Sequence, residues 1–118
     1  MSAIIIKRIY ESAAKADGFR VLVDRLWPRG LKKEDAHLDE WAKAVAPSNE
    51  LRNWFNHEVA KWALFCRRYE AELKENNAVE ALIEQIKEHE TVTLLYAAHD
   101  EQHNQALVLQ KYINKRLK

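Results

Sequence analysis

The feature that most constrains the fold is the apolar run Val21-Leu22-Val23, which ends in the polar segment Asp24-Arg25-Leu26-Trp27-Pro28-Arg29-Gly30. A continuous run of this kind is typical of a strand that is buried on both faces, as in parallel sheets covered by helices. Ligands of α/β proteins bind at the carboxyl ends of such strands. The run therefore predicts an α/β protein with a polar site at residues 24–30.

The remaining pattern predicts a single domain over residues 1–118, with strands over 4–10, 19–26 and 91–98. Helices are expected over residues 33–45, around 51–55, over 59–75, over 77–86 and around 106–117. This order indicates an α/β layer structure with a short, mostly parallel central sheet of about three strands, packed by about five helices. The link between the first two strands is short for a parallel crossover, so the direction of the first strand stays open.

Spacing and capping residues support the expected helices. In the first helix the apolar side chains recur at i, i+3, i+4 and i+7, namely Leu38, Trp41, Ala42 and Val45. Pro47-Ser48 ends this helix and offers an N-cap for the next one. Asn77, with Glu80 three residues later, predicts a capping box at the start of the fourth helix. Three of the four tryptophans fall on helical stripes and are expected in the core, whereas Trp27 lies in a turn.

Composition and the absence of certain motifs disfavour several classes of protein. The chain carries 19 basic and 18 acidic residues, so a net charge of +1 does not favour a duplex-binding protein. No apolar run approaches the roughly 20 residues that a membrane span needs. Since the first residues read as a strand and not as a signal peptide, a cytoplasmic protein is expected. The single cysteine, Cys66, is expected to be an inert buried thiol. With no glycine-rich phosphate loop, no cofactor is predicted.

If the strands over 19–26 and 91–98 are parallel neighbours, their carboxyl ends bring two polar segments together. Paired guanidiniums on a stiff Trp-Pro turn form a fork that suits phosphate or carboxylate. The expected ligand-binding residues are Arg25, Trp27, Arg29, Arg52, His99 and Asn104. His57 and His103 are the candidates for acid–base catalysis, because histidine titrates near neutral pH.

Each of these residues also has a structural interpretation. The arginines can pair with Asp24 or Asp100, and Arg52 can form a surface ion pair. His99 and His103 are four residues apart and can cap or hydrogen-bond, while a metal site is less favoured because no cysteine lies near to complete it.

A second functional hypothesis is a nucleic-acid-associated or transcription-related accessory module that uses the basic cluster at residues 20–33, with Trp27 as a stacking ring. A third is an accessory protein that acts through a partner surface.

The segment 17–30, Asp-Gly-Phe-Arg-Val-Leu-Val-Asp-Arg-Leu-Trp-Pro-Arg-Gly, resembles the signature of the YeaO-like bacterial proteins. The central block around residues 41–57, the strand Thr93-Leu94-Leu95-Tyr96-Ala97-Ala98 and the segment His103-Asn104-x-Ala106 extend the resemblance over nearly the whole chain. The resemblance implies a small cytoplasmic α/β protein with no assigned reaction. More distant relatives carry Cys-His-Arg near the start of the last helix, where this chain has His103-Asn104-Gln105, so thiol chemistry is not carried over.

Taken together, these patterns predict a protein that binds, and could process, an anionic small molecule bearing phosphate or carboxylate. Nucleic acid is the less favoured partner and no membrane partner is expected. The sequence carries no indication of the oligomeric state.

Overall fold

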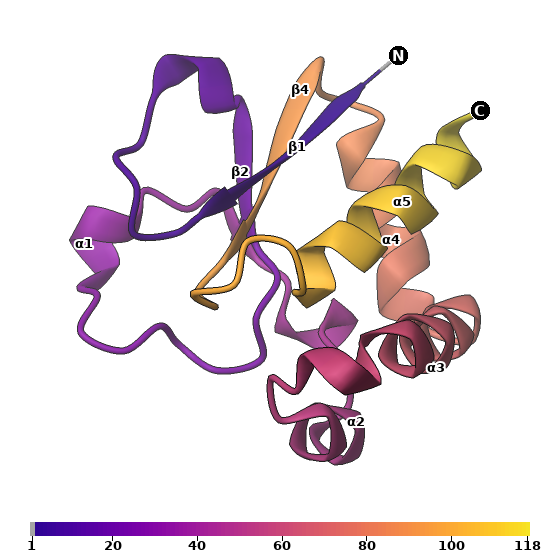
Figure 1. Ribbon diagram of the computed structural model, residues 1–118. Coiled ribbons are helices and arrows are strands. Elements are labelled where there is room, and N and C mark those ends of the chain that lie inside the picture. The colour runs from indigo at the N-terminus through magenta and orange to yellow at the C-terminus, as the bar shows by residue number, and fades with distance from the viewer. Residues whose placement is uncertain (1) are drawn as a thin grey trace.

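A computed structural model, which describes residues 2–118, shows one sheet of four parallel strands in the spatial order β1-β4-β2-β3 (Figure 1). The strands are β1 (Ala3–Arg8), β2 (Phe19–Leu22), β3 (Glu40–Trp41) and β4 (Thr91–Tyr96). The helices are α1 (Lys33–Ala36), α2 (Asn49–Phe55), α3 (Trp62–Lys74), α4 (Asn77–Ile86) and α5 (Gln105–Leu117). Short 3₁₀ turns lie at Lys15–Asp17, Lys43–Val45 and Val59–Lys61. The α/β fold class is confirmed, with β3 added to the expected strands.

The first strand is parallel to its neighbour, which settles the direction that the sequence left open. β1 pairs with β4 from Ala3 opposite Thr91 to Arg8 opposite Tyr96. β2 pairs with the other edge of β4, from Phe19 opposite Val92 to Leu22 opposite Leu95. Because β4 separates β1 from β2, residues 9–18 connect two strands that are not neighbours. The expected parallel pairing of the second strand with the strand at residue 91 is confirmed.

The two faces of the sheet are covered unequally (Figure 1). The larger core joins β1, β2 and β4 to helices α2–α5 and includes the fully buried Tyr69, Leu73, Leu94, Leu109 and Ile113. On the opposite face a smaller core holds Ile9, Leu22, Ala36 and Leu95, with Trp27 and Trp41 packed against it. Both faces of β2 are therefore buried, as the apolar run predicted.

The expected helix over residues 33–45 is wrong. α1 ends at Ala36, and His37 then adopts a left-handed conformation with φ 49°. The backbone N–H of Asp39 donates to the Arg20 carbonyl, and that of Ala42 donates to the Leu22 carbonyl. Residues 40–41 thus form β3 along the open edge of β2. Backbone pairing with this edge outweighs the helical spacing of the apolar residues, and Trp41, partly buried, packs against the smaller core.

Other expected boundaries need smaller corrections. β2 ends at Leu22, not at residue 26, because its pairing ends where the Val23 N–H donates to the Leu95 carbonyl. The N-cap of α4 is Asn76, whose side chain accepts from the Ala78 N–H, so the capping box predicted at Asn77 is wrong. Ser48 caps α2 as predicted, accepting from the Leu51 N–H.

A buried ion pair holds β2 to the segments before and after it. The guanidinium of Arg20 pairs with Asp17 and donates to the carbonyls of Ala36 and His37 at 2.9 Å each. Both charged residues are buried, and Lys7 also contacts the Asp17 carboxylate. Burial by itself raises the pKa of Asp17. The bonds from the Ala14 N–H, Lys7 and Arg20 outweigh burial, so the pKa lies below its ordinary value.

Candidate functional site

Three strand ends meet at the carboxyl edge of the sheet. β1 ends at Arg8, β4 at Tyr96 and β2 at Leu22, and β4 lies in the middle. The loop that leaves β4 therefore runs between the residues that follow β1 and those that follow β2. This edge is the place where parallel α/β proteins bind their ligands.

Arg8 fixes one side of the loop that follows β4. Its Nε donates to the Ala98 carbonyl at 2.8 Å and its Nη2 donates to the Ala97 carbonyl at 3.2 Å. The guanidinium carbon lies 5.1 Å from the centre of the Tyr10 ring, and the Tyr10 hydroxyl donates to the Arg29 carbonyl at 2.8 Å. Arg8 thus links the end of β1 to the loop after β4 and, through Tyr10, to the turn that holds Arg29.

Asp24 holds the opposite side of the same loop. Its Oδ2 accepts from the Ala97 N–H at 3.0 Å, and its Oδ1 accepts from the side-chain amide of Gln105 at the start of α5. Its own carbonyl accepts from the indole N–H of Trp41 at 2.8 Å. Burial raises the pKa of Asp24 to about 6, although both hydrogen bonds and the charge of His57 act to lower it. A carboxyl with this pKa exchanges its proton near neutral pH.

Arg25 holds the segment before α2. Its Nε and Nη2 donate to the carbonyls of Pro47 and Ala46, each at 3.1 Å. The alternative expectation of an ion pair with Asp24 or Asp100 is wrong for Arg25, because main-chain carbonyls take these two nitrogens. The Nη1 of Arg25 has no hydrogen bond within residues 2–118, and no unpartnered side-chain nitrogen or oxygen in this part of the chain is buried. Nη1 is therefore open to solvent.

The loop between β4 and α5 is organised by Asp100. Its Oδ1 accepts from the N–H groups of Gln102 and His103, and its Oδ2 lies 2.9 Å from Nδ1 of His103. The bonds from Gln102 and His103 lower the pKa of the Asp100 carboxyl. Asn104 is buried and caps α5, accepting from the Leu107 N–H while its amide donates to the Asp100 carbonyl. The side chain of Asn104 is therefore used within the fold.

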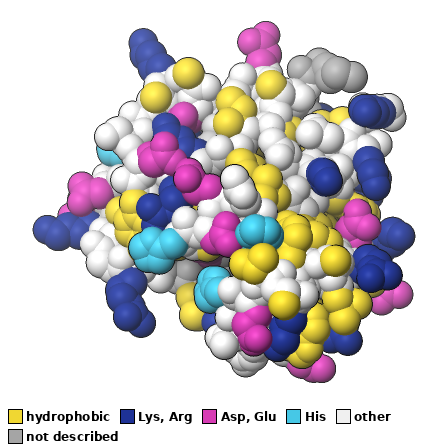
Figure 2. All heavy atoms as spheres, in the orientation of Figure 1, with side chains coloured by type: hydrophobic (Ala, Val, Ile, Leu, Met, Phe, Trp, Pro, Cys, Tyr) yellow, Lys and Arg dark blue, Asp and Glu magenta, His cyan; other side chains and the backbone are white. Residues whose placement is uncertain are grey.

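His57 and His103 approach this edge from two different elements. His57 follows α2 in a left-handed conformation with φ 57°, directly after Asn56 with φ 45°. Such a conformation is uncommon for residues other than glycine and is concentrated at functional sites. A series of ring contacts joins the two histidines: His57 to Phe55, Phe55 to Trp62, and Trp62 edge-on to His103 at 5.3 Å. Figure 2 shows histidine side chains beside acidic side chains near the middle of the molecular face that it draws.

Within residues 2–118, no hydrogen bond or ion pair joins the other expected site residues to Asp24. Trp27 is half-buried, donates from its indole to the Leu31 carbonyl at 2.6 Å and packs edge-on against Trp41. Arg29 and His99 are exposed. Arg52 is exposed on α2 and has a 3.4 Å hydrogen bond to Asn49. Trp41, expected on a helical stripe, lies instead on β3.

Sequence reasoning missed three residues of this edge, namely Arg8, Asp24 and Gln105 as site residues. Asp24 directly follows the buried run 21–23, so its place at a strand end was a usable signal. Arg8 follows the first apolar run in the same way. Gln105 carried no signal, because only the packing of α5 against the sheet brings its amide to Asp24.

Three observations concern the other classes of protein and of site weighed from the sequence. Within the basic cluster at residues 20–33, Arg20 is buried in its ion pair and Arg25 is bonded to carbonyls, which leaves Arg29, Lys32 and Lys33 exposed. Within residues 2–118, no group of three or more histidine, cysteine or acidic side chains could hold a metal ion. No helix in the same part of the chain is long and apolar enough to cross a membrane.

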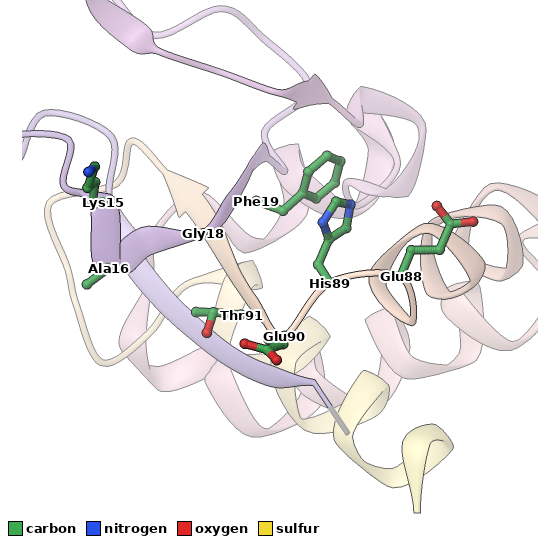
Figure 3. A pocket seen from close by; sticks show the side chains of 8 residues that line it. All are labelled: Lys15, Ala16, Gly18, Phe19, Glu88, His89, Glu90 and Thr91. Atoms are coloured by element: carbon green, nitrogen blue, oxygen red, sulfur yellow. The ribbon is translucent and has the colours of Figure 1, made fainter.

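A hollow of about 450 Å³ lies at the opposite, amino edge of the sheet (Figure 3). It is lined by Lys15, Ala16, Gly18, Phe19, Glu88, His89, Glu90 and Thr91. Phe19 and His89 stack in parallel there, with ring centres 4.1 Å apart. Gly18 has φ +64° at this point, and a Cβ on it would overlap the Thr91 carbonyl oxygen. Because Glu88 and Glu90 oppose Lys15, this hollow is less suited to an anion than the carboxyl edge.

The fold defines a small parallel α/β protein that carries arginine, aspartate and histidine side chains near the carboxyl ends of its strands. The sequence model of the family described as "Inactive DUF488-N3 subclade" matches residues 3–118, and the chain belongs to this family.

Its relatives include the uncharacterized protein YeaO of Escherichia coli (strain K12), which is 46% identical over 107 residues, 91% of this chain and 93% of YeaO. The uncharacterized protein Rv3073c of Mycobacterium tuberculosis (strain ATCC 25618 / H37Rv) is 38% identical over 111 residues, 94% of this chain and 93% of Rv3073c. The resemblance to the YeaO-like proteins is confirmed. No solved structure matches the chain.

Proposed function

We propose that this protein binds a small cytoplasmic molecule that bears phosphate or carboxylate, at the carboxyl edge of the sheet beside Asp24. The observation that carries the proposal is the pair of arginines that flank the strand ends. Arg8 and Arg25 each use Nε and Nη2 to hold main-chain carbonyls, and each has an Nη1 without a partner among residues 2–118. Carbonyl bonds fix the orientation of a guanidinium without neutralising its charge, which prepares the group for an anion.

The surrounding groups add positive charge in the same region. Arg29 is tied to the Arg8 side through Tyr10, so its exposed side chain starts close to the β1 end of the edge. The charge of His57 lowers the pKa of Asp24, and His103 contacts the same aromatic series from the loop between β4 and α5.

Binding without turnover is the form of the proposal that the family favours, because the description of its subclade contains the word "Inactive". His57 and His103 are accordingly proposed to contact the ligand and to hold protons near it. A nucleic-acid function is less supported, because Arg20 and Arg25 of the basic cluster are engaged in the fold and Trp27 is half-buried.

The test is a titration of the full chain with sodium phosphate, followed by ¹⁵N–¹H spectra at constant ionic strength. The largest shifts are expected at the Ala97, Gln102 and His103 amides and not at Thr91 on the opposite edge. Arg29→Ala is expected to weaken binding about tenfold, whereas Lys33→Ala, an exposed cation of the same cluster, serves as the matched control. Because Arg29 contributes only its backbone carbonyl to the fold contacts above, the variant is expected to stay folded.

The outcomes separate the hypotheses. Shifts confined to the amino edge, or no shifts, would refute the proposal. If Arg29→Ala binds as tightly as Lys33→Ala does, Arg29 is not part of the site. A parallel titration with a short DNA duplex, in low and high salt, addresses the alternative: binding that weakens steeply with salt is the mark of a nucleic-acid partner.

A further inference from the structure

The carboxyl group of Asp24 lies in the middle of the proposed anion site, between the loop after β4, the first turn of α5 and His57. A carboxylate repels a bound anion at close range, and this repulsion grows in a partly buried setting. The groups that face Asp24 are His57 at the end of α2, Ala97 after β4 and Gln105 on α5. Its chain neighbour Arg25 and the buried hydroxyl of Tyr69 on α3 lie close by. A ligand that binds here must therefore carry a group that interacts favourably with the carboxylate.

We infer that Asp24 accepts a hydrogen bond from the ligand, so that the site selects an oxyanion with its own acidic O–H, namely hydrogen phosphate, over sulfate. This inference rests on the proposed function and narrows its ligand class. Inorganic phosphate keeps at least one proton throughout the neutral range, whereas sulfate has none to donate. A shared proton between the two anionic oxygens makes a short, charge-assisted hydrogen bond.

The hydrogen bonds of Asp24 leave room for this contact. Each carboxylate oxygen has two lone pairs, and the structure shows one donor on each: Ala97 N–H on Oδ2 and the Gln105 amide on Oδ1. The side chain is half-buried and not sealed from solvent. The same two donors hold the carboxyl in a fixed orientation, which a selective contact requires.

Sulfate, which has no proton to donate, binds only after Asp24 has itself taken up a proton. Burial holds the pKa of Asp24 at about 6, so protonating it at pH 7 costs about a tenfold loss of affinity, and at pH 8 about a hundredfold loss. Phosphate binding does not incur this loss of affinity, because phosphate itself supplies the proton of the hydrogen bond. Phosphate itself changes charge near neutral pH whereas sulfate does not, so the difference in this ratio between the wild type and Asp24→Asn at the same pH isolates Asp24.

The experiment titrates the full chain with sodium phosphate and, separately, with sodium sulfate at pH 7 and constant ionic strength. The wild type is expected to bind phosphate about tenfold more tightly than sulfate. This preference for phosphate is expected to grow at pH 8 and to disappear near pH 5. In Asp24→Asn the ratio is expected to fall below about threefold at every pH, because the amide can donate to sulfate. Glu101→Gln, which removes one exposed negative charge from the loop after β4, is expected to keep the wild-type ratio.

Each outcome has one meaning. If the wild type binds neither anion, the proposed function fails. If it binds both equally at pH 7 and pH 8, the site binds anions but the selection by Asp24 is refuted. If Glu101→Gln lowers the ratio as much as Asp24→Asn does, net charge explains the preference and the inference is overturned. Should Asp24→Asn fail to fold, the wild-type ratio between pH 5 and pH 8 decides alone, since a ratio independent of pH excludes a role for the Asp24 proton.

Discussion

Replacing Asp24 by asparagine is expected to stabilise the protein at neutral pH. The fold raises the pKa of this carboxyl from 3.8 to about 6, so ionisation is less favourable in the folded chain than in the unfolded chain. Between these two pH values the folded state binds more protons than the unfolded state, and stability falls as the pH rises. The stabilising contribution is complete below pH 3.8 and is lost as the pH passes through 6.

The size of the effect follows from the same two values. The difference corresponds to about 3 kcal/mol of unfolding free energy, of which about 2 kcal/mol falls between pH 4 and pH 7. Asparagine has nearly the same shape, can still accept from the Ala97 N–H and does not ionise. The variant gives up some strength in this hydrogen bond, so a net gain of about 1–3 kcal/mol at pH 7 is expected.

Urea unfolding of both proteins at pH 4, 5, 6 and 7 measures this difference, because other titrating groups cancel in the comparison. Asp100→Asn is the control of opposite sign. The N–H groups of Gln102 and His103 lower the pKa of Asp100, so its contribution is present at neutral pH and is lost as the pH falls. An Asp24→Asn variant that is less stable than the wild type at pH 7, or a difference that does not vary with pH, would refute the reasoning.

Two further substitutions test the fold. Arg20→Met is expected to lower the unfolding free energy by about 3–5 kcal/mol in urea, because Asp17 and two carbonyls stay buried without this partner. A loss below about 1 kcal/mol would mean that Lys7 and the Ala14 N–H satisfy Asp17 without Arg20. Gly18→Ala is expected to lower the melting temperature or prevent folding, because the backbone has φ +64° and the new Cβ meets the Thr91 carbonyl. An unchanged melting temperature would contradict the close approach.

Much of the fold could be predicted from local patterns. Residues 21–22 and the segment at residues 91–96 lie in strands because their β-branched and aliphatic side chains are buried between two layers. Ser48 caps α2 and the last helix begins at Gln105, since capping and apolar spacing act over a few residues. β3 could not be predicted in this way, because a two-residue strand depends on the free edge of β2.

The candidate site was predictable in place but not in detail. The sequence indicated that residues 24–29 and 99–104 meet at one edge, and the parallel pairing of β2 with β4 brings Asp24 to Ala97. The role assigned to each side chain was harder to infer. Asn104 is an N-cap and Arg25 holds two carbonyls, because buried main-chain groups need partners that local patterns do not reveal.

The sequence by itself determined the fold class and the edge of the sheet that carries the polar residues, because burial of an apolar run and the direction of a strand are local properties. Only the tertiary structure decided the order β1-β4-β2-β3, which places Arg8 and Asp24 on opposite sides of the loop after β4. It also decided the environment of Asp24, because the raised pKa depends on burial by segments far apart in the chain. The pKa of an ionisable side chain depends on the groups that surround it, and these groups come together only when the chain has folded.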